Sequence, residues 1–127
     1  MDASYDIQSP DDQLNKMMLA GQFMEGYERF YSEGVVMQEN AMPPCVGKDA
    51  NRTRQMAFYQ SVRDFHSVRL IGRAIDGYRS YSEWEFEMTF QNGARYTMPE
   101  VAVRQWQDGQ IVNERFYWDL SGYPGGV

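Results

Sequence analysis

The stretch YRSYSEWEFEMTF, residues 78–90, alternates large apolar side chains with charged ones and decides the fold of the chain. Alternation with a period of two is typical of a β-strand with one buried face and one solvated face. The apolar face carries Trp84, Phe86, Met88 and Phe90, and the opposite face carries Glu83, Glu85 and Glu87. We interpret the glutamates as a solvated rim rather than catalytic groups, because like charges at this spacing repel one another. Their expected partners are Arg73, Arg79, Arg95 or Arg104.

Three more stretches with the same period flank this one. They are HSVRLIGRAID (66–76), ARYTMPEVAVRQWQ (94–107) and QIVNERFYWDL (110–120). The dipeptides between the four segments, Asp76-Gly77, Asn92-Gly93 and Asp108-Gly109, favour tight hairpins because they tolerate positive φ. The sequence therefore predicts a four-stranded antiparallel meander of long, curving strands. Gly72 and Pro99 are the natural places for a bulge or bend.

The segment before the meander has helical periodicity. Ser9-Pro10, followed by two aspartates, offers a helix start. Apolar side chains then recur every three or four residues from Leu14 to Tyr31, which is typical of an amphipathic helix. Gly21 and Gly26 weaken such a helix, and they mark either close packing or a break into two shorter helices.

A short strand and a second helix are predicted between this segment and the meander. Residues 35–39 form an apolar run that ends in a glutamate, and Pro43-Pro44 stops it. A helix is then predicted over residues 48–62. Its apolar side is expected to carry Met56, Tyr59 and Val62, and its solvent side Lys48, Arg52 and Arg54.

This order of elements predicts the fold class. A curved sheet must bury its concave face, and only the helices are available to cover it. We expect a single α+β domain over residues 1–127, a cone-shaped sheet wrapped around two to three helices, with loosely held ends at 1–9 and 121–127. The chain has nine methionines, nine tyrosines, seven phenylalanines and three tryptophans. Such side chains suit the wall of an apolar pocket between the sheet and the helices.

Composition argues against several classes of function. The net charge is -6 and basic residues form no run or stripe, so nucleic acid is not an expected partner. No apolar run approaches the roughly 18 residues of a membrane span, and no signal-peptide pattern is present, so we expect a cytoplasmic protein without a membrane partner. One cysteine excludes an internal disulfide, and a single histidine makes a zinc site hard to build. No metal or cofactor is expected.

Two stretches resemble a known superfamily. The first stretch has the order helix end, strand, carboxylate, proline and start of the next helix that is found in that superfamily, and it is FYSEGVVMQENAMPPCVGKDA (30–50). The second resembles the last hairpin of the superfamily, and it is EVAVRQWQDGQIVNERFYWD (100–119). Together they resemble the nuclear transport factor two-like superfamily, in its SnoaL-like and ketosteroid-isomerase-like branch, over residues 11 to 120. The resemblance implies the cone fold, but it does not select one activity, because this superfamily contains isomerases, cyclases, dehydratases, epoxide hydrolases and non-catalytic binding proteins.

The resemblance also suggests catalytic positions. A carboxylate base at the end of the first strand would be Glu39, and a slip of one residue would place Asn40 there; both would otherwise be part of a polar turn. An oxyanion-stabilising acid would fall at Ala102, with Glu100 two residues earlier on the same face. The partner tyrosine of the first helix is missing, because residues 14–18 carry no hydroxyl group. Ketosteroid isomerisation itself is therefore not expected.

Two further acid–base candidates come from the strand ends. Asp119 matches an acid near the chain end of SnoaL-like cyclases, and it shares strand parity with Arg115 and Tyr117; otherwise it is a turn starter. His66 suits proton transfer near neutral pH, or else bonds to backbone or water.

We therefore expect a protein that binds a small hydrophobic molecule, with proton transfer or hydration at Glu39, Asp119 and His66. The supporting residues would be Tyr31, Asn40, Glu100, Trp106, Arg115 and Tyr117. The alternative is a non-catalytic ligand-binding or dimerising domain. A homodimer through the sheet is expected in either case.

Overall fold

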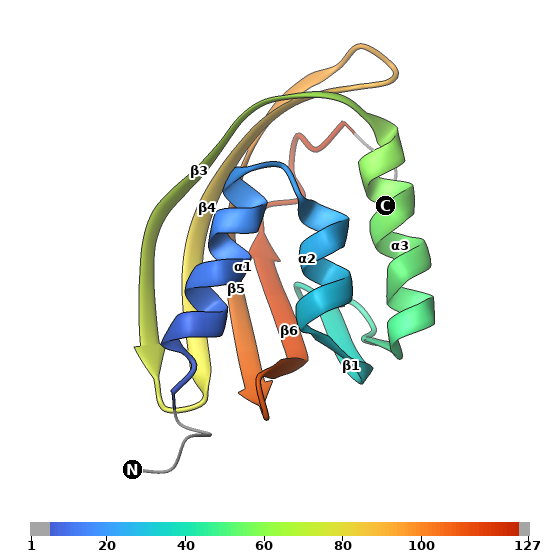
Figure 1. Cartoon of the computed structure of the whole chain (residues 1–127). Helices are drawn as coiled ribbons and strands as arrows, with labels where there is room; N and C mark the ends of the chain where they lie inside the picture. The colour runs from blue at the N-terminus through green and yellow to red at the C-terminus, as the bar shows by residue number, and fades with distance from the viewer. Residues whose placement is uncertain (1–5, 125–127) are drawn as a thin grey trace.

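The computed structural model describes residues 6–124 and has the predicted α+β architecture (Figure 1). The helices are α1 (Gln8–Leu19), α2 (Phe23–Phe30) and α3 (Lys48–Ser61). The strands are β1 (Tyr31–Glu39), β2 (Cys45–Val46), β3 (Val62–Asp76), β4 (Arg79–Phe90), β5 (Arg95–Gln107) and β6 (Gln110–Trp118). The curved sheet wraps around the helices, which lie on its concave side. Among the described residues, no helix is long and apolar enough to cross a membrane.

The first helical region is two helices, as one of the two readings of its glycines predicts. α1 ends at Leu19, and Gly21 turns the chain with a φ of 77° before α2 begins. Gly26 has the other role, because a Cβ atom there would lie 2.8 Å from Leu14 Cδ1. The break at Gly21 and the close approach at Gly26 fold α2 back against α1.

The sheet has the strand order β2-β1-β6-β5-β4-β3. β3 to β6 form the predicted antiparallel meander, and Gly77, Gly93 and Gly109 all have positive φ in its turns. β1 pairs with β6 in parallel, so the complete sheet is mixed. An extra residue beside Gly72 bulges β3, whereas Pro99 stays in regular register with Glu85. The bulges of β3 help the long strands to curve.

The alternation in β4 is confirmed. Trp84, Phe86, Met88 and Phe90 are all buried in one apolar cluster. On the outer face Glu85 pairs with Arg69 at 2.9 Å, and Glu87 pairs with Arg95. The expected partners Arg73 and Arg104 instead bind carboxylates of other elements.

The orientation predicted for the second helix is partly wrong: Tyr59 and Val62 lie inward and Arg54 is exposed as predicted, but two other residues are reversed. The residues of α3 that line the cavity between the helices and the sheet are Asn51, Arg54, Gln55, Phe58 and Tyr59. Met56 is exposed and Lys48 is buried, the reverse of the prediction. Hydrophobic periodicity fails here because this face of α3 borders a partly polar cavity rather than a dry core.

Both chain ends are held more firmly than expected where the structure describes them. Ile7 is buried in the core, and α1 already begins at Gln8. Tyr123 makes edge contacts with the rings of Phe90, Tyr96 and Trp118, at centroid distances of 5.5, 5.4 and 5.0 Å. A buried aliphatic side chain near one end and an aromatic side chain near the other therefore pack these segments against the domain.

Candidate functional site

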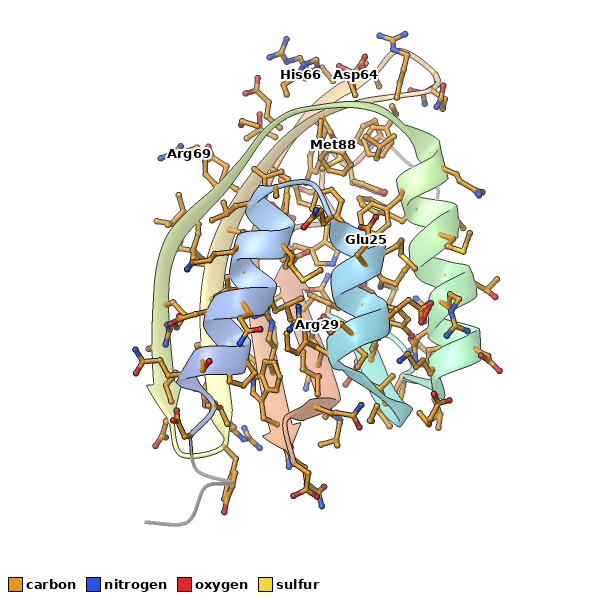
Figure 2. All side chains as sticks on the ribbon, in the orientation of Figure 1. Glu25, Arg29, Asp64, His66, Arg69 and Met88 are labelled. Carbon is orange, nitrogen blue, oxygen red and sulfur yellow. The ribbon has the colours of Figure 1, made fainter. Side chains whose placement is uncertain are left out.

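A cavity of about 250 Å³ lies between the concave face of the sheet and the three helices. Figure 2 shows side chains filling most of this space, with Met88 inside the curve and Arg69 outside it. The apolar lining comes from all three helices and from the sheet, and includes Phe23, Phe58, Phe65, Phe86, Phe116 and Trp118. The polar lining residues include Glu39, Glu100, Glu114, Tyr31, Tyr59, Arg54 and Arg104. This cavity lies between the sheet and the helices, and its lining combines apolar side chains with several ionisable groups.

Strand register sets the floor of this cavity. Glu39 of β1 lies opposite Phe116 of β6, and Phe116 lies opposite Ala102 of β5. Two residues before Ala102 on β5, Glu100 lies opposite Trp118. Two residues after Ala102, Arg104 lies opposite Glu114. Residues two apart on a strand share a face. Three carboxylates from three neighbouring strands therefore face the same cavity.

Glu39 and Asn40 have different roles at the end of β1. The Glu39 carboxylate lines the cavity and accepts a 2.7 Å hydrogen bond from Trp118 Nε1. Asn40 turns the chain with a φ of 50°, and its side-chain oxygen accepts a bond of 2.9 Å from the Trp118 backbone N–H. Burial raises the pKa of Glu39, while the Trp118 bond and the charge of Arg54 act against that rise. Asn40 therefore anchors β1 to β6, and Glu39 faces the cavity as a carboxyl group.

Glu100 is the carboxyl group most strongly biased towards its neutral form. Burial raises its pKa well above the ordinary value, and the charges of Glu39 and Glu114 raise it further, against Arg104. Its side chain keeps some accessible surface because it faces the cavity. No side chain or backbone group within residues 6–124 makes a hydrogen bond to its carboxyl group. A neutral carboxyl group of this kind can donate a hydrogen bond to a ligand.

The Tyr59 hydroxyl also faces the cavity without a hydrogen-bond partner among the described residues. Its ring stacks on Phe23 at 4.9 Å and packs edge-on against Phe58 at 5.3 Å. Burial raises the pKa of Tyr59 strongly, and the charge of Glu100 is the next largest cause. Tyr59 therefore remains a protonated donor in a fixed position. It supplies a hydroxyl group from α3, whereas the resemblance places one on the first helix.

A buried ion network lies under one end of the cavity. Arg104 donates to Asp11 at 2.9 Å, to Glu114 at 3.1 Å and to Asn15 at 2.7 Å. Tyr31 donates a short hydrogen bond to Glu114. Burial raises the pKa of Glu114, and Arg104 opposes that rise. The sequence analysis gave Asp11 only a role in the helix start, assigned no role to Asn15 or Glu114, and placed Arg104 among the partners of the solvated glutamates.

Six predicted site residues do not line the cavity: Asn40 and Trp106, which have structural roles beside it, and His66, Asp119, Arg115 and Tyr117. His66 bonds to Thr89 Oγ1 at 2.7 Å and sits in a bulge of β3 near the upper rim in Figure 2. Asp119 accepts a 2.9 Å bond from the Ser121 backbone N–H, which is the alternative role of turn starter. Arg115 and Tyr117 lie together on the convex face of the sheet, with the guanidinium 4.9 Å from the ring centre.

A bulge in β6 explains why Arg115 and Tyr117 lie on the convex face rather than in the cavity. Gln105 pairs with Asn113 and Trp106 pairs with Ile111, so Val112 is an extra residue. An extra residue reverses which side chains face inward beyond it. Ile111 and Glu114 are consequently both buried. Of the other predicted residues, Tyr31 and Glu100 do line the cavity.

Trp106 has a structural role beside the cavity. It is buried in the core, and its Nε1 donates to Ser80 Oγ at 3.0 Å. Ser80 in turn donates to Asp11 at 2.7 Å. Within residues 6–124 no cluster of three His, Cys, Asp or Glu side chains is arranged to hold a metal ion.

The fold defines a member of the nuclear transport factor two-like superfamily. A family model for the SnoaL-like domain matches residues 7–118, so the chain belongs to the SnoaL-like domain family. None of the curated proteins compared with the chain matches it.

Solved structures support the same fold. A candidate SnoaL-like polyketide cyclase from Mesorhizobium loti has a TM-score of 0.78 and 23% identity, covering 87% of this chain and 97% of that one. A second candidate cyclase, from Jannaschia sp. CCS1, has a TM-score of 0.78 at 12% identity, with 95% and 92% covered. A protein with a ketosteroid isomerase-like fold from Catenulispora acidiphila, solved with trimethylamine, has a TM-score of 0.72 at 10% identity, with 86% and 87% covered. At these identities the likeness establishes the fold and not the activity.

Proposed function

We propose that this protein is an enzyme of the isomerase or cyclase type that moves a proton at a carbon atom next to a carbonyl group. The observation that carries the proposal is that one ionisable carboxylate, Glu39, shares an apolar cavity with two unpartnered donors, Glu100 and Tyr59. A base and oxygen-directed donors that border the same small cavity are what such proton transfer needs.

The proposed step assigns a role to each group. The Glu39 carboxylate removes a proton from the carbon, and the electron pair of the broken C–H bond moves towards the carbonyl oxygen. Neutral Glu100 and Tyr59 donate hydrogen bonds to that oxygen as its negative charge develops. The proton then returns from Glu39 to another carbon atom in an isomerisation. In a cyclisation the carbanion instead attacks a second carbonyl group of the same molecule, and the alkoxide that forms takes the proton from Glu39.

Cavity size limits the substrate class. A cavity of about 250 Å³ falls below the roughly 300–1,000 Å³ that accommodates drug-sized ligands. Its walls are mostly aromatic and sulfur-containing side chains. Small carbonyl compounds with one or two rings therefore suit it best.

The test is proton exchange in heavy water, followed by NMR on small ring ketones such as indanone and tetralone. The wild type should accelerate exchange of the protons next to the carbonyl group. Glu39→Gln keeps the shape and the Trp118 hydrogen bond but removes the base, so exchange should slow on the order of a hundredfold or more. Glu85→Gln, on the outer face of β4, is the matched control and should exchange like the wild type.

The alternative is a non-catalytic ligand-binding domain. It is favoured by Arg104, which already neutralises Glu114 and Asp11 and so gives those carboxylates a structural role. Ketones that bind in the cavity without faster exchange, or exchange that is unaffected by Glu39→Gln, would support this alternative and reject the enzyme.

A further inference from the structure

Arg54 is a cation on the face of α3 that borders the cavity. The lining residues of this helix follow the three-to-four spacing of one helical face: Asn51, Arg54, Gln55, Phe58 and Tyr59. Arg54 is exposed, although it lines the cavity, whereas Tyr59 lies one turn further along and is more enclosed. The guanidinium therefore lies at the mouth of the cavity and the Tyr59 hydroxyl lies deeper.

Among the described residues Arg54 forms no salt bridge, unlike the other cations of α3, although its charge acts on Glu39. Arg52 binds Glu28 at 2.6 Å and Asp49 at 2.5 Å, and Lys48 lies 3.9 Å from Glu28. Among residues 6–124, no carboxylate oxygen lies within 4.0 Å of the Arg54 guanidinium. Its five N–H donors are therefore available to a ligand at the mouth.

The other lining arginine cannot provide this binding site. Arg104 is fully buried, and Asp11, Asn15 and Glu114 already occupy its donors. An anionic ligand group would therefore have to be recognised at the mouth. A guanidinium matches a carboxylate there with two parallel hydrogen bonds.

We propose that the substrate is a small oxo acid, whose carboxylate binds Arg54 at the mouth while its carbonyl oxygen reaches Glu100 and Tyr59. This inference rests on the proposed function for the carbonyl end and adds the second, anionic end. The net charge of -6 and the Glu39 carboxylate both repel an anion. Arg54 is the group that offsets this repulsion, so it decides whether an acid or a neutral analogue binds better.

The experiment compares two ligands of almost the same shape, benzoylpropionate and benzoylpropionamide. Both carry a phenyl ketone, and only the first carries a negative charge. Binding is measured by calorimetry at neutral pH and low salt. The wild type should bind the acid about three- to fivefold more tightly than the amide, as expected for a partly exposed ion pair. Added salt should reduce this preference.

The variants separate this inference from the proposed function. Arg54→Gln should abolish the preference for the acid, and Arg54→Lys should keep part of it. Arg69→Gln removes the same charge from the outer face and should leave the preference unchanged. Glu100→Gln and Tyr59→Phe should change the affinity for both ligands alike, because they act on the shared ketone.

Two results would overturn the inference. Equal or tighter binding of the amide by the wild type would mean that Arg54 does not recognise an anion. A preference for the acid that persists in Arg54→Gln would place the recognition elsewhere. If neither ligand binds the wild type, the proposed carbonyl site fails together with its anionic extension, whereas loss of preference alone leaves the carbonyl site intact.

Discussion

Replacing Arg104 by methionine should destabilise the fold severely. The side chains of Arg104, Asp11 and Glu114 are exposed by 1%, 0% and 1%, so water cannot replace the lost guanidinium. Asp11 would keep Arg73 as its ionic partner, at 3.4 Å, and neutral donors in Ser80 and Asn15, while Glu114 would keep the Tyr31 hydroxyl. Removing one partner of a buried ion pair costs about 3–5 kcal/mol. That is a large fraction of the roughly 5–15 kcal/mol by which domains are stable.

Urea unfolding at pH 7, followed by tryptophan fluorescence, measures this cost. Adding Glu114→Gln to Arg104→Met should recover part of the loss, because the second change removes one of the uncompensated carboxylates. The cost should also shrink towards acid pH, where Glu114 can take up a proton instead. Arg69→Met, on the outer face, provides the control and should cost less than about 1 kcal/mol. If Arg104→Met cost no more than that control, the buried network would not have the energetic role assigned to it.

Three other predictions follow from the site and the sheet. The pKa of Glu100 is raised in the folded state, so as pH rises the unfolded chain loses this proton first, and the free energy of unfolding falls between the two pKa values. Over that range, urea unfolding should show the stability of Glu100→Gln rising relative to the wild type by up to about 1.4 kcal/mol per pH unit. Parallel pH profiles for the two proteins would contradict this. Trp118→Phe removes a bond that lowers the pKa of Glu39, so that pKa should rise further in an NMR carboxyl titration, and an unchanged value would mean that the bond is weak. The homodimer remains a prediction, based on Val101 and Tyr117, which are exposed and paired on the convex face of the sheet. Sedimentation should give a dimer for the wild type at micromolar concentrations and a monomer for Val101→Arg. A monomeric wild type would refute the prediction.

The meander could be predicted because its determinants are local. Alternation in residues 78–90 and three glycine turns define strands and hairpins without reference to the rest of the chain. Glu39 was selected through the family resemblance, which implies a carboxylate at the end of the first strand just before a proline. Even the two roles of Gly21 and Gly26 were among the alternatives that helix propensity allows.

The rest of the site depends on tertiary structure. The bulge at Val112 has no sequence signal as clear as a glycine or proline, yet it decides that Glu114 faces inward and Arg115 outward. Arg104 looks like a surface cation in sequence, and it is buried only because Asp11 and Glu114 meet it. The inward face of α3 is partly polar because it borders a cavity. Periodicity therefore misplaced Met56 and Lys48, and it did not show that the exposed Arg54 also borders the cavity.

The buried network also restricts the order in which the chain can assemble during synthesis. Asp11 and Arg104 are 93 residues apart, so α1 emerges from the ribosome long before its partner on β5 exists. Docking α1 early would bury Asp11 and Asn15 with their polar groups unpaired, which is unfavourable. The first helix of the chain should therefore be among the last to be fixed in place. Until then the nascent chain would leave its apolar sheet face uncovered, which is the stage at which a chaperone would be needed most.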